Sequence, residues 1–415
     1  MNKVTNYLLV LCIGINVLSL NYIVGGILSL SGQQVSLATN LCCLAVILRR
    51  YGELLKVRFL GVILLVVFVV PLAGYSINYY GQDFDRLVFW ANRSVLILLT
   101  YSSTAIILRR VSPQFLSSLS NVFLLIYSSS VIISYFFPLE ALYVFTNGGE
   151  EIWGNIDNLS TTRAFGLDLS PTVAAAGMIN LYVAAQIFST ASGSRIGVLY
   201  GALLDALVIG VLVLTGSRSY FVIGTTCVIL INLHRGSLDI VRRESSLGKY
   251  VSLRRLVYLG GFLIVGATLI SDSVGSQRIL GEITGVDSGG GNVSTEIRLI
   301  AWNVGLALFG QNIFFGVGFD ALQLKGIILS HNMFLHYLIT NGLILGSVYL
   351  YFLYSVGRSI YRVEYIWLST SVILSLVGSS LFSHSVLDDK TFPWLIISAA
   401  YLVGERMRSR RQNRR

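Results

Sequence analysis

Apolar segments separated by short polar segments recur along almost the whole chain. Many are about 17–25 residues long, which is the length of an α-helix that crosses the hydrocarbon core of a bilayer. Backbone groups in lipid need internal hydrogen-bond partners, and the period-two alternation of a membrane β-barrel is absent from the sequence, so helices are expected. The pattern predicts an all-α, polytopic integral membrane protein with one membrane domain over residues 1–415.

About twelve spans are expected from the lengths of the apolar segments. They cover residues 7–29, 33–48, 59–77, 88–108, 115–137, 171–190, 196–214, 217–232, 255–271, 332–355, 364–383 and 391–405.

The polar segments between the spans are unequal in length. We expect two long loops outside the cytoplasm, over residues 138–170 and 272–331, and the later one should contain short helices such as 295–309. Residues 233–254 are expected to form a basic cytoplasmic loop, and residues 406–415 a basic cytoplasmic tail. Long loops in a compact protein are commonly functional or disordered, so the outer loops are the first places to look for chemistry.

The net charge of +10 is distributed unevenly along the chain. If both termini are cytoplasmic, most Lys and Arg fall on the inner side and most Asp and Glu on the outer side, as the positive-inside rule describes. This distribution argues against nucleic-acid binding and favours contact of the basic tail with anionic lipid headgroups. The four cysteines all fall within expected spans, without the spacing of a metal site, so they are expected to be packing residues.

The outer segment late in the chain contains a stripe of residues at helical spacing. Arg298 and Trp302 lie four residues apart and would share one helix face, which Gly305 and Phe309 continue. Aromatic rings of this kind belong to the interfacial belt of membrane proteins, but Trp302 could also stack on a sugar. The sequence Gly316–Val317–Gly318 predicts a tight turn at which the backbone can approach a ligand.

Four arginines are expected near outer span ends or in outer loops: Arg163, Arg218, Arg278 and Arg298. Each offers a permanently charged fork that suits phosphate oxygens, although snorkelling or pairing with an outer carboxylate is the alternative for each. His331 lies where an imidazole can exchange protons with water, and a purely structural hydrogen bond is the alternative there.

Other ionisable residues give weaker predictions. His234 is expected to be a solvated residue of the cytoplasmic loop. Asp205 falls inside a span, where an acid is a functional candidate by default, or it could bond neighbouring Ser or Tyr hydroxyls. His384, before Asp388 and Asp389, could form a weak metal or proton site, but no metal cluster is expected on the outer side.

Three segments together resemble the bacterial O-antigen polymerase and O-antigen ligase superfamily, whose members are polytopic membrane glycosyltransferases. They are TTRAFGLDLSPTVAA (161–175), TGSRSYFVIG (215–224), and the region 298–346 with R-x3-W, G-x-G and SHNMFLHYLITNGLILG. In the polymerase form of the last motif, His is followed at fixed spacing by Gly-x-x-Gly. Here Gly342 is at that spacing, whereas the second glycine is one place late, at Gly346.

The resemblance implies a glycan donor carried on undecaprenyl diphosphate at the outer face of the bacterial inner (cytoplasmic) membrane. It implies that Arg163, Arg218 and Arg298 surround the diphosphate, that His331 lies near the acceptor hydroxyl, and that Trp302 and Asn332 contact glycan. His331 and Arg218 are the expected catalytic residues, in a metal-independent and cofactor-free transfer with inversion.

The acceptor would be a glycan or a lipid, and a chain-length regulator and a flippase are possible protein partners. Polymerase and ligase activities both remain open from the sequence. A flippase of lipid-linked oligosaccharide is the alternative from another class, since twelve spans with both ends inside suit transporters equally well.

Overall fold

The computed structural model describes residues 3–18, 20–28, 32–54, 61, 95, 98–108, 110–146, 164–168, 170–193, 197–243, 260, 291–317, 332–361, 365–382 and 391–412. This part of the chain is helical and contains no β-strand, as the hydrophobic pattern predicts. The expected spans 59–77 and 255–271 lie outside the described residues, apart from isolated positions.

The N-terminal region contains α1 (Lys3–Val17), α2 (Asn21–Leu28), α3 (Gly32–Arg49) and α4 (Tyr51–Leu54). The middle of the chain forms α8 (Pro113–Phe136), α9 (Pro138–Thr146), the 3-10 turn η3 (Gly166–Asp168), α11 (Pro171–Ser192), α12 (Val198–Thr215) and α13 (Arg218–Arg243). The C-terminal region contains α16 (Gly291–Gln311), α18 (Met333–Tyr361), α19 (Ile366–Phe382) and α20 (Phe392–Gln412).

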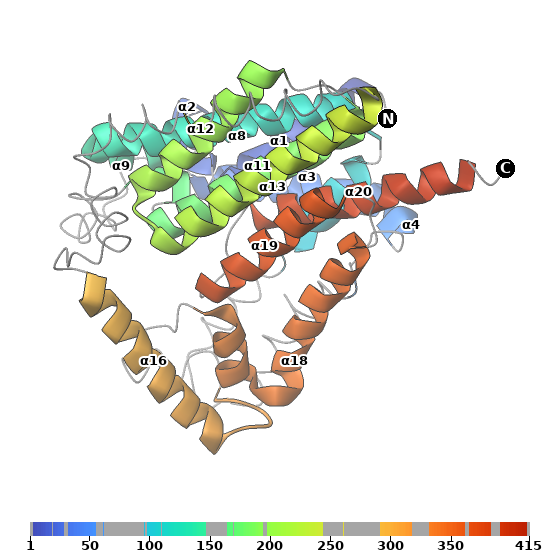
Figure 1. The fold of residues 1–415 in the computed structure, drawn as a ribbon. Helices are drawn as coiled ribbons and strands as arrows, with labels where there is room; N and C mark the ends of the chain where they lie inside the picture. Colours follow the sequence, from blue (N-terminus) through green and yellow to red (C-terminus); the bar gives the residue numbers. More distant parts are fainter. Residues whose placement is uncertain are drawn as a thin grey trace.

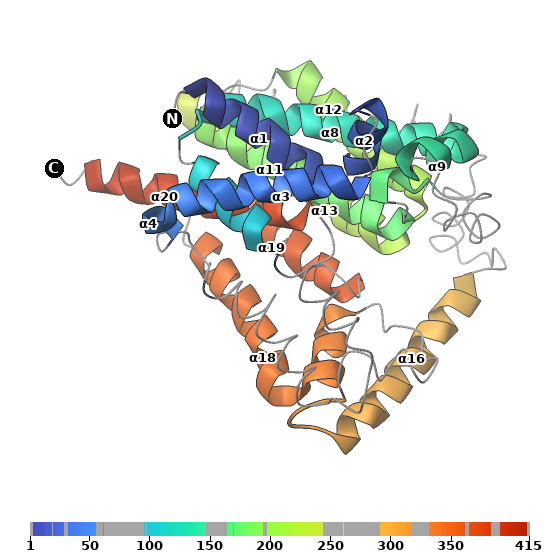
Figure 2. The ribbon, with the colours of Figure 1, turned by 180° about the vertical axis from the view of Figure 1, so that it is seen from behind.

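Both chain termini lie at one end of the bundle, which we call the proximal end (Figures 1 and 2). The other end, where α9 and the turn between α12 and α13 lie, is the distal end. The helices α16 and α18 extend away from the main bundle on one side.

Helix α11 is the centre of the bundle, and its residues from Ala174 to Ser189 are all buried. It packs against α8, α12, α13, α19 and α20. Trp394 of α20 is fully buried beside it, with its ring 5.8 Å from that of Phe188 and 5.3 Å from that of Phe123. The indole nitrogen of Trp394 donates to Ser120 Oγ at 3.3 Å, so this large side chain is buried without leaving its N–H unpaired.

Small residues let the helices approach closely. A Cβ on Gly177 of α11 would lie 2.3 Å from the hydroxyl oxygen of Tyr127 in α8, and one on Gly378 of α19 would lie 2.5 Å from Ile223 of α13. Small residues at helix contacts and buried hydroxyl groups are typical of helix packing in membranes, where lipid supplies no hydrophobic driving force between helices.

The outer surface is apolar along several helices. On α3, the exposed residues Leu37, Leu41, Leu44 and Leu48 recur at helical spacing, and polar residues such as Thr39 and Asn40 are buried instead. Three helices of the described chain are long and apolar enough to cross a bilayer: Pro113–Phe136, Pro171–Ser192 and Phe334–Tyr361. These features are those of an integral membrane protein, and the total of twelve spans stays a prediction.

The expected first span, 7–29, is wrong as one continuous helix. The structure divides it into α1 and α2. At the junction, the amide of Leu20 donates to the carbonyl of Ile15, five residues back, at 2.9 Å. This wider turn interrupts the i to i−4 ladder and redirects the chain.

The first long outer loop is also shorter than expected. Residues 138–146 form α9, because α8 ends at Phe136, Phe137 is its C-cap, and Pro138 can start a new helix but cannot continue the old one. Residues 164–168 return into the bundle, where Ala164 and Phe165 are buried. Residues 147–163 lie outside the described part of the chain.

Two expected cytoplasmic segments continue as helix. The first eleven residues of the predicted basic loop 233–254 belong to α13, which runs to Arg243. The predicted tail 406–415 is helical as far as Gln412, because α20 continues past the apolar segment and projects from the proximal end (Figure 1). Hydropathy shows where the side chains along a segment become polar. The helix itself can continue beyond that point, because it ends only where its backbone hydrogen bonds end.

Candidate functional site

The segment that follows Arg163 is fixed against two helices at the distal end. The amide of Ala164 donates to the carbonyl of Leu214 in α12 at 3.1 Å. The amides of Phe165 and Gly166 both donate to Ser134 Oγ of α8, at 3.1 and 3.0 Å. One buried serine thus holds two backbone donors of a non-helical segment, and the backbone next to position 163 lies beside the last turn of α12.

Arg218 begins α13 directly after that turn. Gly216 ends α12 in the left-handed conformation, at φ 58°, and its amide donates to the carbonyl of Val213 at 2.9 Å. A cation at the first position of a helix is opposed by the positive end of the helix dipole, by roughly 0.3–1 kcal/mol. An anion at this end would be attracted by both the guanidinium and the first-turn N–H groups.

A chain of contacts joins the start of α13 to the start of α18. Two residues after Arg218, the hydroxyl of Tyr220 donates to the carbonyl of Ser379 in α19 at 3.4 Å. The next residue, Ser380, is hydrogen-bonded through its hydroxyl to the hydroxyl of Tyr349 in α18 at 2.6 Å. The ring of Tyr349 then stacks on that of Tyr337 at 4.8 Å, in the first turns of α18. The helix starts that carry Arg218 and the His331–Asn332 motif are therefore linked through the end of α19.

Asn332 has a structural contact that the sequence analysis did not anticipate. Its Oδ1 accepts from the amide of Leu335 at 3.1 Å, so it caps the N-terminus of α18. This bond orients the side chain on which the expected glycan contact depends.

Position 298 lies on α16, so the expected helix 295–309 is confirmed with wider bounds, Gly291–Gln311. Along this helix, Ala301, Gly305 and Leu308 are buried, and a Cβ on Gly305 would lie 2.4 Å from Ile339 of α18. By helical register, positions 298 and 302 fall on the same face, and Trp302 is half-buried. The face of α16 that carries Ala301, Gly305 and Leu308 is therefore the one turned towards α18.

The turn that begins at Gly316 has a packing role, while Gly318 lies outside the described residues and the expected ligand contact stays a prediction. Gly316 (φ 73°) packs against the backbone of Gly342 (φ 67°), where α18 is kinked. A Cβ on Gly316 would lie 2.4 Å from the Gly342 nitrogen, and a Cβ on Gly342 would lie 2.3 Å from the Phe314 carbonyl. Three backbone bonds complete the junction, from the amide of Val317 to the Ile339 carbonyl at 2.8 Å, from Leu343 to the Ile313 carbonyl at 2.7 Å and from Ile344 to the Phe314 carbonyl at 3.3 Å.

This junction sets the direction of α16. Its Gln311 end is held at the kink of α18, so its Gly291 end points back towards the distal end of the bundle (Figures 1 and 2). The described parts of the segments 161–175 and 215–224 thus meet at the distal end, towards which the Gly291 end of α16 also points. Four of the expected residues lie outside the described part of the chain: Arg163, Arg278, His331 and His384. For Arg298, the backbone is described but the side chain is not.

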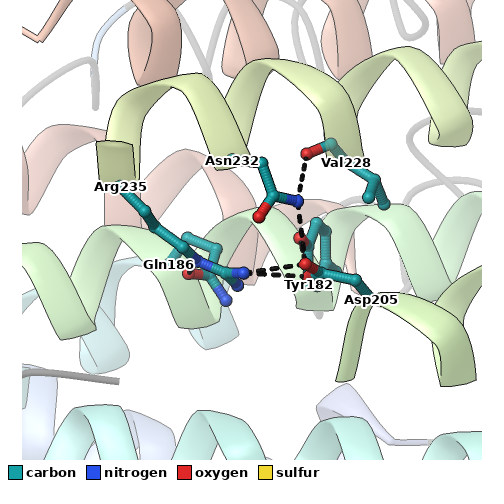
Figure 3. Close-up of polar contacts among 6 residues, drawn as sticks. All are labelled: Tyr182, Gln186, Asp205, Val228, Asn232 and Arg235. Atoms are coloured by element: carbon teal, nitrogen blue, oxygen red, sulfur yellow. Dashed lines mark hydrogen bonds and ion pairs between the residues drawn. The ribbon is translucent and has the colours of Figure 1, made fainter. Parts of the chain in front are cut away.

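A second group of polar residues, which the sequence analysis recognised only in part, lies inside the bundle (Figure 3). Asp205 of α12 is 1% exposed, and Arg235 of α13 is 8% exposed. Their ion pair has a distance of 2.8 Å between Nη1 and Oδ2. Tyr182 donates to Asp205 Oδ1 at 2.5 Å, and Asn232 donates to Oδ2 at 2.8 Å.

The expectation that Asp205 could bond a neighbouring hydroxyl is confirmed by Tyr182, but its charged partner was missed. Arg235 had been assigned to a cytoplasmic loop because a polar run follows it. The spacing of Asn232 and Arg235, three apart on one helix face, was the signal that could have placed both in α13.

The prediction for His234 is wrong. It is 2% exposed, its Nε2 is hydrogen-bonded to Thr190 Oγ1 at 3.1 Å, and its ring packs edge-on against that of Tyr365 at 5.2 Å. A histidine next to a basic loop is buried here because α13 extends the bundle beyond its apolar segment.

Comparisons with known proteins add no assignment. The sequence matches no protein-family model, and it matches no curated protein.

Proposed function

We propose that this protein is a membrane glycosyltransferase of bacterial surface-polysaccharide assembly, which transfers a glycan from undecaprenyl diphosphate at the outer face of the inner membrane. The observation that carries the proposal is the 3.1 Å hydrogen bond from Ala164 to Leu214. It joins the segment 161–175, which contains Arg163, to the residue directly before the segment 215–224, which contains Arg218; both segments resemble the O-antigen polymerase and ligase superfamily.

Two further features support an anion site at the distal end. Arg218 starts α13, where the first-turn N–H groups of a helix can attract an anion together with the guanidinium. The contacts of Tyr220 with Ser379, of Ser380 with Tyr349, and of Tyr349 with Tyr337 connect the first turns of α13 and α18, which supports the proposal. In this proposal both chain termini are cytoplasmic, and the distal end faces outwards.

The proposed reaction is a single displacement. The acceptor sugar hydroxyl attacks C1 of the donor glycan as the bond from C1 to the diphosphate oxygen breaks, and His331 accepts the hydroxyl proton. Arg163, Arg218 and Arg298 stabilise the negative charge that develops on the diphosphate leaving group. Because attack and departure occur on opposite faces of C1, the product has inverted stereochemistry.

Arg218 gives the sharpest test. Purified full-length protein in detergent is given an undecaprenyl-diphosphate-linked oligosaccharide, and glycan products are resolved by length. Arg218→Ala is expected to lower the transfer rate by about 10²–10³-fold, the usual effect of removing one preorganised charge-stabilising donor. Arg218→Lys keeps the charge but loses the fork, so partial activity is expected.

The matched control is Arg358→Ala. Arg358 is an exposed arginine near the opposite end of α18, where it contacts the ring of Tyr354 at 5.9 Å. Its replacement is expected to leave the rate unchanged. Equal rates for Arg218→Ala and the unmodified protein, with equal protein levels, would remove Arg218 from the mechanism. Product with the donor's anomeric configuration would exclude the single displacement.

Ligation is the closest alternative within this class, and the product distinguishes the two. A polymerase yields a ladder of longer lipid-linked glycans, whereas a ligase transfers one finished glycan to a different acceptor.

A transporter of lipid-linked oligosaccharide is favoured by one observation, the ion pair of Asp205 and Arg235 inside the bundle, because transporters carry polar sites within the membrane. A transporter needs two compartments. Glycan elongation by detergent-solubilised protein would therefore favour the enzyme, and movement of the lipid across a vesicle without elongation would favour the transporter.

A further inference from the structure

Around Asp205, the hydrogen-bond acceptors all have partners, whereas some of the donors have none among the described residues. Both carboxylate oxygens are saturated, because Oδ1 accepts from Tyr182 and Arg235 and Oδ2 accepts from Asn232 and Arg235. On the other side of the guanidinium, Arg235 Nε donates to Gln186 Oε1 at 3.1 Å. The carboxylate oxygens of Asp205 and the Oε1 atom of Gln186 therefore already accept hydrogen bonds from Arg235.

Two donors at the same place have no partner within the described chain. They are Nη2 of Arg235 and Nε2 of Gln186, and both atoms are fully buried. The Nε–H and an Nη2–H of arginine point to the same side of the planar group, and Gln186 already binds that side through Oε1. Figure 3 shows the Gln186 amide lying against the guanidinium of Arg235. One small acceptor beside Gln186 could therefore receive hydrogen bonds from both groups.

Leaving these donors unpaired would be costly. A buried donor without a partner costs about 1–3 kcal/mol, and more when the group is charged. The charges of Asp205 and Arg235 cancel, so a neutral acceptor satisfies the donors without adding net charge to the bundle. Water is the smallest such acceptor, and buried waters typically bond otherwise unsatisfied polar groups.

Polar residues also lead from this group towards the proximal end. Tyr182, Gln186 and Thr190 recur every four residues on one face of α11, and Thr190 is hydrogen-bonded to His234 of α13. Burial decreases along this face, since Gln186 is buried, Thr190 is half-buried and Gly193, which ends the helix, is exposed. The neighbouring α13 ends beside the N-terminus (Figure 1). Within the described residues, this polar face of α11 leads from Gln186 towards the proximal end.

We propose that Gln186 and Arg235 bind water in a polar inlet that opens only at the proximal end of the bundle. The inlet hydrates the buried ion pair from one side of the membrane, and the saturated carboxylate of Asp205, with Tyr182, closes its inner end. This site is separate from the distal groups to which the glycan chemistry is assigned, so the two proposals fail or succeed independently.

Cysteine accessibility tests the inlet, because a thiol reacts as its thiolate, which forms readily only where water is present. The native residues Cys12, Cys42, Cys43 and Cys227 are replaced, and Gln186→Cys, Thr190→Cys and Val183→Cys are made separately in the full-length chain. Val183 is the matched control, since it is fully buried in the same helix and apolar. Sealed vesicles of each orientation, sorted by the accessibility of a C-terminal tag, are treated with a charged, impermeant methanethiosulfonate reagent.

Labelling of Gln186→Cys is expected from the side that exposes the tag, at a rate at least about tenfold above that of Val183→Cys. Thr190→Cys should react faster from the same side. A folded Gln186→Cys protein that reacts no faster than Val183→Cys, or that reacts from the other side, would overturn the inlet.

An experimental structure provides a second measurement that needs no substitution. An ordered water within about 3.2 Å of Arg235 Nη2 and Gln186 Nε2 supports the proposal. A bromide peak at that position after exchange of the salt would show an anion site instead of a water site. An empty, dry contact between the two groups would also overturn it.

Discussion

The ion pair between Asp205 and Arg235 should be one of the most sensitive points of the fold. Asp205→Asn keeps the size and shape of the side chain but removes its charge. The guanidinium of Arg235 then stays in the bundle without a counter-ion, because the described residues around it offer no second carboxylate. The fold must either leave this charge unpaired or open to hydrate it.

The magnitude follows from burial. The side chains of Arg235 and Asp205 are 9% and 1% exposed. Removing one partner of a buried pair costs about 3–5 kcal/mol, whereas an exposed pair contributes roughly 0–1 kcal/mol. The pair of Glu53 with Arg110 supplies the matched control, since those side chains are 24% and 37% exposed. Glu53→Gln should therefore change the free energy of unfolding by less than about 1 kcal/mol.

The assay is reversible unfolding of the purified protein in mixed micelles, with helix content followed by circular dichroism as denaturing detergent is added. Asp205→Asn and Arg235→Gln are each expected to lower the free energy of unfolding by about 3–5 kcal/mol. The double variant should lose less than the sum of the two, by about 1–3 kcal/mol, because it leaves no unpaired charge.

Two results would refute this reasoning. One is an Asp205→Asn protein that is no less stable than Glu53→Gln. The other is strict additivity in the double variant, which would mean that the two charges do not interact in the folded protein.

Two further changes test the distal half of the structure. Gly342→Ala places a Cβ 2.3 Å from the Phe314 backbone at a positive φ, so we expect a large fall in the yield of monodisperse protein. Gly357→Ala, with its nearest neighbour atom at 4.0 Å, should be neutral or stabilising by up to about 1 kcal/mol, and equal yields for the two would contradict the kink geometry. Ser134→Ala leaves two buried amides without their acceptor, at about 1–3 kcal/mol each, so those amides should exchange hydrogen faster. Ser130→Ala removes only a bond to its own helix and should not change that exchange rate.

Much of the helical framework could be predicted from the sequence because lipid imposes a strong local constraint. Every backbone group in the hydrocarbon must be paired within its own segment, so an apolar segment of sufficient length is a helix whatever surrounds it. The bounds of α8, α11, α12 and α19 therefore agree with the predicted spans to within a few residues. Where helices extend beyond apolar segments, as α13 and α20 do, hydropathy underestimated them.

The sequence by itself determined that this is a helical membrane protein, that Arg218 starts a helix and that Arg298 and Trp302 share a helix face. Only the tertiary structure decided that Arg235 is buried with Asp205, and that Gly316 packs against the backbone of Gly342. The reason is that composition and periodicity describe one segment at a time. Whether a charge meets water or a counter-ion, and whether a glycine meets a ligand or another backbone, depends on a helix many residues away in the chain.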